Sequence, residues 1–197
     1  MRQCIAASQY LNQLIHSGSL THGGKQINRL LGRFNEENGK HFRNSVANWI
    51  KENMQLIVWS YEVTMKPKGH FNADKDYGDC DILAYDPTIN QVYNIECKRT
   101  EAARNIHQMK KEMDAYLGRA GQKKKVAKHV DRDNWLQANL DQVKIFVDAE
   151  KTPKVKSLIL TSELIPTRYL REGEIPMPII SYRELKRNGS NSLQNWL

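Results

Sequence analysis

The chain has 197 residues, of which 40% are hydrophobic. This length suits one domain with a substantial core, with or without a small helical appendage, and it argues against two full domains. Lysine and arginine number 30 against 22 acidic residues, so the net charge is +8. Such a balance favours phosphate-rich partners, although a merely soluble basic protein has the same composition.

The three cysteines, Cys4, Cys80 and Cys97, form an odd set without CxxC spacing. This pattern argues against a zinc ribbon and against a disulfide framework, and it favours a reducing cytoplasm. Apolar runs fall short of the roughly 20 residues that a membrane span needs. The N-terminus also lacks the apolar region of a signal peptide. We therefore expect a cytoplasmic protein without membrane association.

Helical spacing of apolar residues predicts an all-helical front end. One helix is expected over residues 2–16, and a second from Lys25, with a break at Gly39 before the pattern resumes at residues 42–50. The β-branched and aromatic stretch "QLIVWSYEVTM" predicts a strand at residues 55–65, followed by a loop at residues 66–78.

The following elements are predicted in chain order as strands 79–86 and 91–98, a helix over residues 100–118 that stops at Gly118, a helical run from Val126 to about Asp148, a strand at 154–162, and a short strand with a helical turn at 177–185. Helices, three strands, helices and two more strands indicate a mixed α/β layer arrangement.

A hairpin is the most informative of these elements. The four-residue loop from Pro87 to Asn90 has a common hairpin length and fixes the register of the flanking strands. The predicted pairs are Asp86 with Gln91, Asp81 with Glu96, and Asp79 with Lys98. Side chains alternate between the two faces of a sheet. The chemical face then carries Asp79, Asp81, Glu96 and Lys98, and the core face carries Cys80, Ile82, Ile95 and Cys97.

Directly opposed carboxylates repel each other because their β-carbons lie within about 5 Å. A divalent cation offsets this repulsion, and Mg²⁺ is commonly held by one or two carboxylates, waters and a substrate phosphate. Lys98 on the same face supplies a positive charge that can orient a water. The pattern predicts a site for metal-assisted hydrolysis, while an ordinary charged and solvated strand face is the alternative.

The residues Asp81, in "GDCDILAYD", and Glu96 and Lys98, in "YNIECK", resemble the signature of the PD-(D/E)XK nuclease superfamily. The order of elements over residues 40 to 185 is similar to that family as well. The resemblance implies a restriction-endonuclease-like core with a mixed central β-sheet flanked by helices. It further implies that Asp81 and Glu96 bind catalytic Mg²⁺, for which Mn²⁺ can substitute, that Lys98 positions the attacking water, and that the substrate is DNA.

The same resemblance suggests accessory positions. Asp79 occupies an acidic position that varies in the family. Many members carry a glutamate on the helix before the sheet, where "GKHFRNSV" has Arg43 instead. Glu36, seven residues earlier, or its neighbour Glu37 is a candidate substitute, and Gln108 matches a position where some branches have a helping side chain. The alternative for Glu36 and Glu37 is a pair of solvated helix charges, and the alternative for Gln108 is an ordinary polar surface residue.

A basic cluster downstream of the signature is a candidate nucleic-acid-binding surface, because lysine and arginine follow the phosphate backbone. Its members are Lys123, Lys124, Lys125, Lys128 and Arg132. A solvated helix face is the alternative.

We expect a helical N-terminal extension at residues 1–38 and a PD-(D/E)XK nuclease-like domain at residues 39–197. The expected function is metal-dependent hydrolysis of phosphodiester bonds, in restriction, antiviral defence or DNA processing. The expected partner is DNA, and a homo-oligomer or a larger defence complex is compatible with the sequence. A nucleic-acid-binding module with little catalysis, or a partner-docking domain, is the alternative function.

Overall fold

The structure is a computed structural model, and it describes residues 24–59, 62–103, 105–119, 121, 126–170 and 173–194. The predicted helix at residues 2–16 and the predicted DNA-binding residues Lys123, Lys124 and Lys125 lie outside these ranges. The chain separates into two compact units, residues 1–42 and residues 43–197. The proposed functional division into residues 1–38 and 39–197 stays a prediction.

Helix α2 (Lys25–Asn53) is continuous over 29 residues, so the predicted break at Gly39 is wrong. A single glycine inside a helix costs only about 1 kcal/mol relative to alanine, which the surrounding turns offset. One such turn is closed by an ion pair of 2.7 Å between Lys40 and Glu36. In the part of α2 that belongs to the second unit, Val46, Ala47 and Ile50 are buried.

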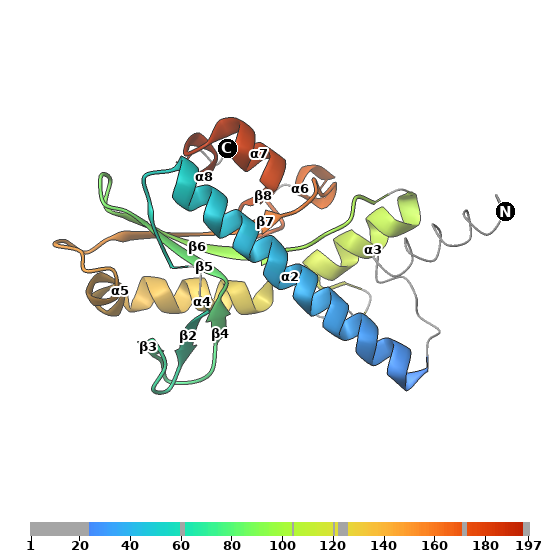
Figure 1. The fold of residues 1–197 in the computed structure, drawn as a ribbon, viewed down its shortest axis with the longest axis horizontal. Coiled ribbons are helices and arrows are strands. Elements are labelled where there is room, and N and C mark those ends of the chain that lie inside the picture. Colours follow the sequence, from blue (N-terminus) through green and yellow to red (C-terminus); the bar gives the residue numbers. More distant parts are fainter. Residues whose placement is uncertain are drawn as a thin grey trace. The chain divides into compact units, whose positions relative to one another are not determined.

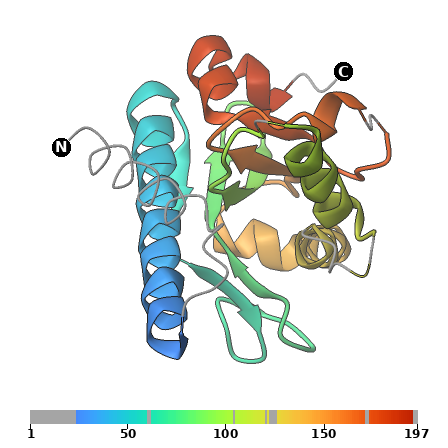
Figure 2. The same cartoon turned by 90° about the vertical axis from the view of Figure 1, so that its right-hand side faces the viewer.

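The central sheet has five strands in the order β1-β5-β6-β7-β8. Their bounds are β1 (Ile57–Trp59), β5 (Ile82–Asp86), β6 (Gln91–Lys98), β7 (Lys154–Thr161) and β8 (Ile179–Ser181). The first three strands are antiparallel and the last three are parallel. This sheet confirms the predicted α/β class with a mixed central sheet. Helix α4 (Ala127–Ala138) covers one side of it, and α2 beyond Arg43 lies on the other (Figures 1 and 2).

The predicted hairpin register is correct from Asp86↔Gln91 to Ile82↔Ile95. The turn is stabilised by Asp86, whose side chain accepts a hydrogen bond of 2.9 Å from the backbone N–H of Thr88. Asn90 completes the turn with a positive φ of 52°. Local turn chemistry was therefore sufficient to fix this part of the register.

A second sheet of three strands has the order β3-β2-β4. Its strands are β2 (Val63–Lys66), β3 (Phe71–Asn72) and β4 (Gly78–Cys80). The predicted strand at residues 55–65 is therefore two strands, because β1 belongs to the large sheet and β2 to the small one. The predicted strand at residues 79–86 is likewise divided, and the division falls at Asp81.

The remaining helices are α3 (Ile106–Leu117), α5 (Leu140–Phe146), α6 (Thr167–Leu170), α7 (Tyr182–Asn188) and α8 (Asn191–Gln194). Gly118 ends α3 in the left-handed conformation, as predicted, with φ 70°. The helical run expected from Val126 to Asp148 is two helices, α4 and α5, because Asn139 leaves the helical conformation between them. The strand at residues 154–162 and the strand leading into a helical turn are confirmed.

The main hydrophobic core joins the two sheets to α4 and α5. It includes Phe71 from β3, Leu83 from β5, Val92 from β6, and Trp135 and Leu136 from α4. Trp135 and Leu136 of α4 and Val143 of α5 thus form a core face. Among the described residues, the helices are too short or too polar to cross a membrane.

Candidate active site at the junction of two sheets

Asp81 lies where the chain passes from the small sheet to the large one. It sits between β4 and β5 and belongs to neither strand. Its side chain accepts a hydrogen bond of 2.8 Å from the backbone N–H of Cys97 in β6. The predicted backbone pairing of Asp81 with Glu96 is therefore replaced by a side-chain contact to the residue next to Glu96. Asp81 is held against the strand that carries Glu96.

Asp79 does not face Lys98, so that predicted pair is wrong. Asp79 pairs with Thr64 in the small sheet, and Lys98 pairs with Thr161 of β7. The reason is that β4 leaves the hairpin to bind β2. The same departure turns Cys80 away from the side of Ile82, where it was expected, into the core that contains Leu83.

Glu96 is a buried carboxylate with a cation at each oxygen. Its Oε1 pairs with the Lys98 ammonium and its Oε2 with the Arg132 guanidinium of α4. Burial by itself raises the pKa of Glu96, but the charges of Arg132 and Lys98 outweigh it and hold that pKa below its usual value. Glu96 is therefore ionised, as a metal ligand must be.

Asp81 behaves in the opposite way. Burial raises its pKa, and the negative charge of Glu96 raises it further. The Cys97 N–H, Lys98 and Arg43 act in the other direction without reversing the shift. The two carboxylates therefore repel each other, as the sequence predicted, although they are not paired residues of one ladder.

Arg43 brings a positive charge to Asp81 at the place where the family resemblance led us to look for a glutamate. Its Nη1 donates to Glu62 at 2.8 Å and lies 3.7 Å from Asp81 Oδ1. The Arg43 side chain is 13% exposed, and its Nε is buried without a hydrogen-bond partner among the described residues. Helix α2 therefore supplies a guanidinium, and not a third carboxylate, at this side of the site.

The other predicted accessory residues are exposed on their own helices. Glu36 pairs with Lys40 on the exposed surface of α2, and Glu37 is exposed as well. Gln108 lies exposed in the first turn of α3, where its backbone N–H donates to the cap residue Asn105.

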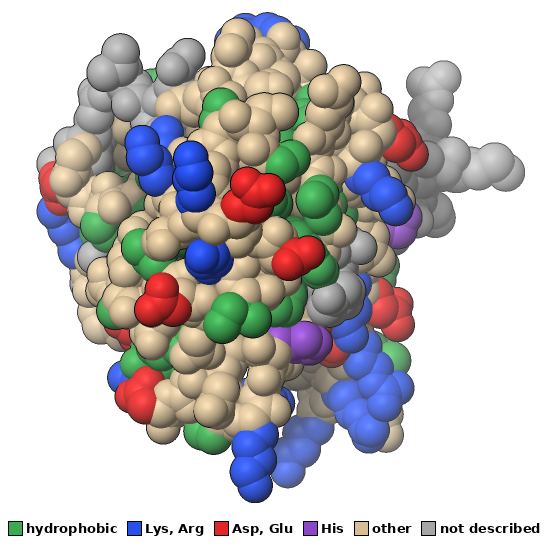
Figure 3. Space-filling model, turned by 90° about the vertical axis from the view of Figure 1, so that its left-hand side faces the viewer, with side chains coloured by type: hydrophobic (Ala, Val, Ile, Leu, Met, Phe, Trp, Pro, Cys, Tyr) green, Lys and Arg blue, Asp and Glu red, His purple; other side chains and the backbone are tan. Residues whose placement is uncertain are grey.

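The predicted DNA-binding surface is described only in part. Lys128 is exposed on α4. The predicted surface position of Arg132 is wrong. Its side chain is only 5% exposed and pairs with Glu96, so Arg132 lies in the site. At the end of the second unit that carries the β5–β6 turn, acidic and basic side chains are interspersed (Figure 3). This mixture is typical of a solvated surface.

Sequence reasoning missed His129 in addition to the position of Arg132. His129 is 1% exposed, and its Nδ1 lies 3.9 Å from Glu96 Oε2. The spacing of three residues puts His129 and Arg132 on one face of α4. The same face continues as the apolar Leu136, and this is the signal that marks Arg132 as buried.

The donor set for a metal ion is small. In the part of the chain that the structure describes, groups of three or more His, Cys, Asp or Glu side chains suited to a metal are absent. Asp81 and Glu96 are two oxygen donors, which fits Mg²⁺ that keeps several waters and binds a substrate phosphate. It does not fit a structural zinc site, which needs four protein ligands.

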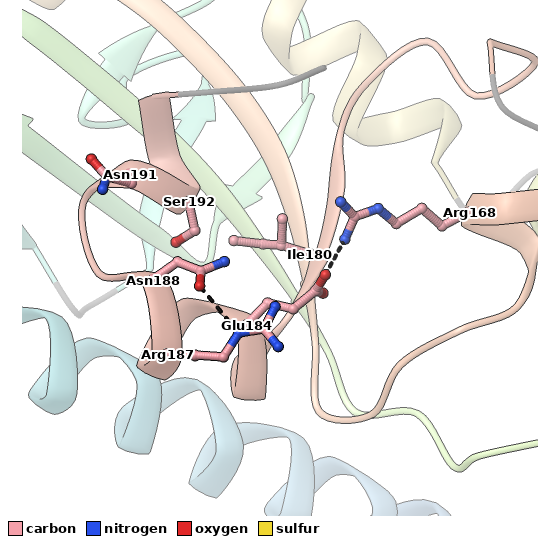
Figure 4. A pocket seen from close by; sticks show the side chains of 7 residues that line it. All are labelled: Arg168, Ile180, Glu184, Arg187, Asn188, Asn191 and Ser192. Carbon is pink, nitrogen blue, oxygen red and sulfur yellow. Dashed lines mark hydrogen bonds and ion pairs between the residues drawn. The ribbon is translucent and has the colours of Figure 1, made fainter.

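A separate hollow of about 440 Å³ lies at α6, α7 and α8. Arg168 and Glu184 point toward each other across it (Figure 4) and pair at 2.8 Å. Ile180 forms part of its wall, whereas its neighbour Ile179 packs in the core beside Ile159. Because successive strand residues face opposite sides, this hollow lies on the other side of the sheet from Glu96.

Comparison with known proteins gives one family match. The model of a family described as "Anti-phage protein Upx-like" matches residues 9–175. This stretch is more than half of the 197 residues, and it contains Asp81, Glu96 and Lys98 together with Arg43 and Arg132. Neither the curated proteins nor the solved structures gave a match.

Proposed function

The chain belongs to the Upx-like family of anti-phage proteins, and we propose that it serves antiviral defence as a metal-dependent nuclease that hydrolyses phosphodiester bonds in DNA. The proposed scaffold is a restriction-endonuclease-like core. The mixed sheet, antiparallel at β1-β5-β6 and parallel at β6-β7-β8, supports this assignment.

One observation carries the proposal. Two carboxylates, the half-buried Asp81 and the buried Glu96, stand close enough that the charge of Glu96 raises the pKa of Asp81. Folding keeps this repulsion although neutral side chains would remove it. Groups whose environments push their pKa values in opposite directions are characteristic of functional sites.

Asp81 and Glu96 are the residues that would hold Mg²⁺, or Mn²⁺ in its place. The ion supplies a water of lowered pKa and stabilises negative charge that develops on the phosphoryl oxygens. Glu96 meets the requirement for an ionised ligand through its contacts with Arg132 and Lys98. The Cys97 N–H donates a hydrogen bond to Asp81 Oδ2 and so orients the Asp81 carboxylate.

Lys98 is the proposed water-positioning residue. Its side chain is 33% exposed, so a substrate can reach it, and its ammonium has three N–H donors. The pair with Glu96 leaves other donors for the attacking water or a phosphate oxygen. Arg43, with its Nη1 3.7 Å from Asp81, supports a site for a single ion, because a guanidinium takes the place of a further acidic ligand.

A second function is supported by the same contacts. Arg132 and Lys98 already neutralise both oxygens of Glu96, and Arg43 lies beside Asp81. The carboxylates are therefore balanced by internal cations without a metal. A nucleic-acid-binding module with little catalysis on the same fold is the alternative that these contacts favour.

Cleavage of phage DNA by the full chain separates the two functions. Wild type, Asp81→Asn and Lys98→Met are incubated with DNA in Mg²⁺, Mn²⁺ or EDTA. Glu150→Gln, a change at an exposed acidic residue, is the matched control. Folding of each variant is followed by circular dichroism, and phage plaque counts are compared in cells that express each one.

We expect cleavage by wild type and Glu150→Gln in Mg²⁺ or Mn²⁺, none in EDTA, and a loss of at least about 100-fold in Asp81→Asn, the scale of losing a group on which charge stabilisation depends. Protection against phage should be lost with cleavage. Salt-dependent DNA binding without cleavage in any metal supports the binding module instead.

A further inference from the structure

We propose that Arg132 and His129 of α4 are positioning residues that hold the Glu96 carboxylate in place relative to Asp81. The inference rests on the proposed function, since it concerns the same metal site. It deepens that function by assigning a role to two residues outside the acid-acid-lysine signature.

The first contact is between Arg132 and Glu96. Residue 132 lies 36 positions beyond residue 96 in the chain, and its Nη2 donates to Glu96 Oε2 in the interior. Lys98 binds the other oxygen. Each carboxylate oxygen therefore has its own cationic partner. A carboxylate held at both oxygens has few alternative rotamers, and ligating carboxylates are commonly held by such outer hydrogen bonds.

His129 in turn fixes Arg132. Its Nε2 lies 3.0 Å from the carbonyl oxygen of Leu158, which only accepts hydrogen bonds, so Nε2 carries the proton. The lone pair of Nδ1 is then directed to Arg132 Nη2 at 3.4 Å. Burial lowers the pKa of His129 to about 4, which agrees with a neutral ring that accepts from the guanidinium.

The third contact comes from the small sheet. A Cβ placed on Gly78 would lie 3.3 Å from Arg132 Nη1, and Gly78 has φ +83°. Gly78 begins β4, the strand that leads directly to Asp81. The Arg132 guanidinium therefore contacts Glu96 and also lies close to Gly78, at the start of the strand that leads to Asp81.

The arrangement is costly for a purely structural residue. Arg132 is nearly buried, and its Nε lacks a hydrogen-bond partner in the part of the chain that the structure describes. A buried ion pair can often be replaced by apolar side chains without loss of stability. A need for an ionised and fixed Glu96 explains the presence of this ion pair, whereas packing alone does not.

The test is Mn²⁺ binding by the full chain, measured by isothermal titration calorimetry beside thermal unfolding. The variants are Arg132→Met, which keeps the apolar stem, Arg132→Lys, which keeps the charge, and His129→Gln. Asn134→Ala, at an exposed position of the same helix, is the matched control. The double variant Arg132→Lys/His129→Gln tests whether the two residues act through each other.

We expect wild type and Asn134→Ala to bind alike, Arg132→Met and His129→Gln to lose about 10- to 100-fold in affinity, and Arg132→Lys to fall between. Adding His129→Gln to Arg132→Lys should cause little further loss. Unchanged or tighter binding by folded Arg132→Met overturns the inference while the proposed function stands. Wild type that neither binds Mn²⁺ nor cleaves DNA overturns both.

Discussion

The carboxylate of Asp81 accepts a hydrogen bond from the backbone N–H of Cys97, the residue that follows Glu96 in β6. This contact closes the β5–β6 hairpin with a side chain at the point where the backbone turns away into β4. It fixes one acidic residue to the strand of the other. The electrostatic cost of that placement is visible in the raised pKa of Asp81.

The contact predicts different effects for two changes at Asp81. Asp81→Asn keeps an oxygen that accepts from Cys97 and removes the repulsion with Glu96, so stability should be unchanged or higher. Asp81→Ala leaves the partly buried N–H of Cys97 without its partner, which should cost about 1–3 kcal/mol. Urea unfolding measures both. An Asp81→Ala variant as stable as Asp81→Asn would contradict the account of this hydrogen bond.

The Glu96–Arg132 pair predicts a strong coupling. Glu96→Gln leaves a buried guanidinium without its counter-charge and should destabilise the fold by about 3–5 kcal/mol, whereas Glu96→Gln combined with Arg132→Met should recover most of that loss. A double-mutant cycle by urea unfolding measures the coupling. The exposed pair Lys40–Glu36 is the control, since Lys40→Ala should leave the unfolding midpoint unchanged. Additive effects of the two buried changes would argue against a direct pair.

A comparison of two glycines with similar φ angles distinguishes the cost of backbone strain from the cost of a side-chain contact. Gly78 and Gly173 have φ of +83° and +79°, but only at Gly78 would a Cβ meet Arg132, at 3.3 Å. Each change to alanine should cost about 1–2 kcal/mol for the left-handed conformation. Gly78→Ala should cost more than Gly173→Ala in thermal unfolding, and the excess should vanish in an Arg132→Met background. Equal costs would mean that Gly78 does not press on Arg132.

The acidic residue of the α7 cap predicts a pH dependence. Burial raises the pKa of Glu184, but hydrogen bonds from the Ser181 N–H and hydroxyl and the charge of Arg168 lower it below the ordinary 4.5. A lowered folded-state pKa gives stability that is present above about pH 4.5 and is lost as pH falls through the folded value. Glu184→Gln should therefore be less stable than wild type at pH 7, with a difference that shrinks in acid. A difference independent of pH would assign the effect to packing.

The β5–β6 pairing and the nearness of Asp81, Glu96 and Lys98 could be predicted because they depend on neighbouring sequence. A four-residue turn fixes the register from Asp86↔Gln91 to Ile82↔Ile95. Beyond Ile82 the prediction failed, because β4 pairs with β2 and not with β6. The choice of partner strand depends on packing with residues outside the strand itself. It leaves no local pattern in the sequence.

Arg132 illustrates the same limit at the site. In the sequence it stands in a run of lysines and arginines, which is ordinarily a solvated face. Its burial depends on Glu96, 36 residues earlier, and on the closeness of Gly78, which only the folded chain creates. A charged residue three positions from a core histidine and four from Leu136 is the sequence feature that distinguishes it from its neighbour Lys128.

The central claim is that Asp81 and Glu96 share one divalent ion, and a Mn²⁺ titration of wild type beside Asp81→Asn tests it most directly. The variant keeps the hydrogen-bond acceptor for Cys97, so its fold should be intact by circular dichroism. We predict one Mn²⁺ per chain in wild type and at least a 10-fold weaker site in Asp81→Asn, in line with the loss of one charged ligand. Equal Mn²⁺ affinity in the two proteins would contradict the claim.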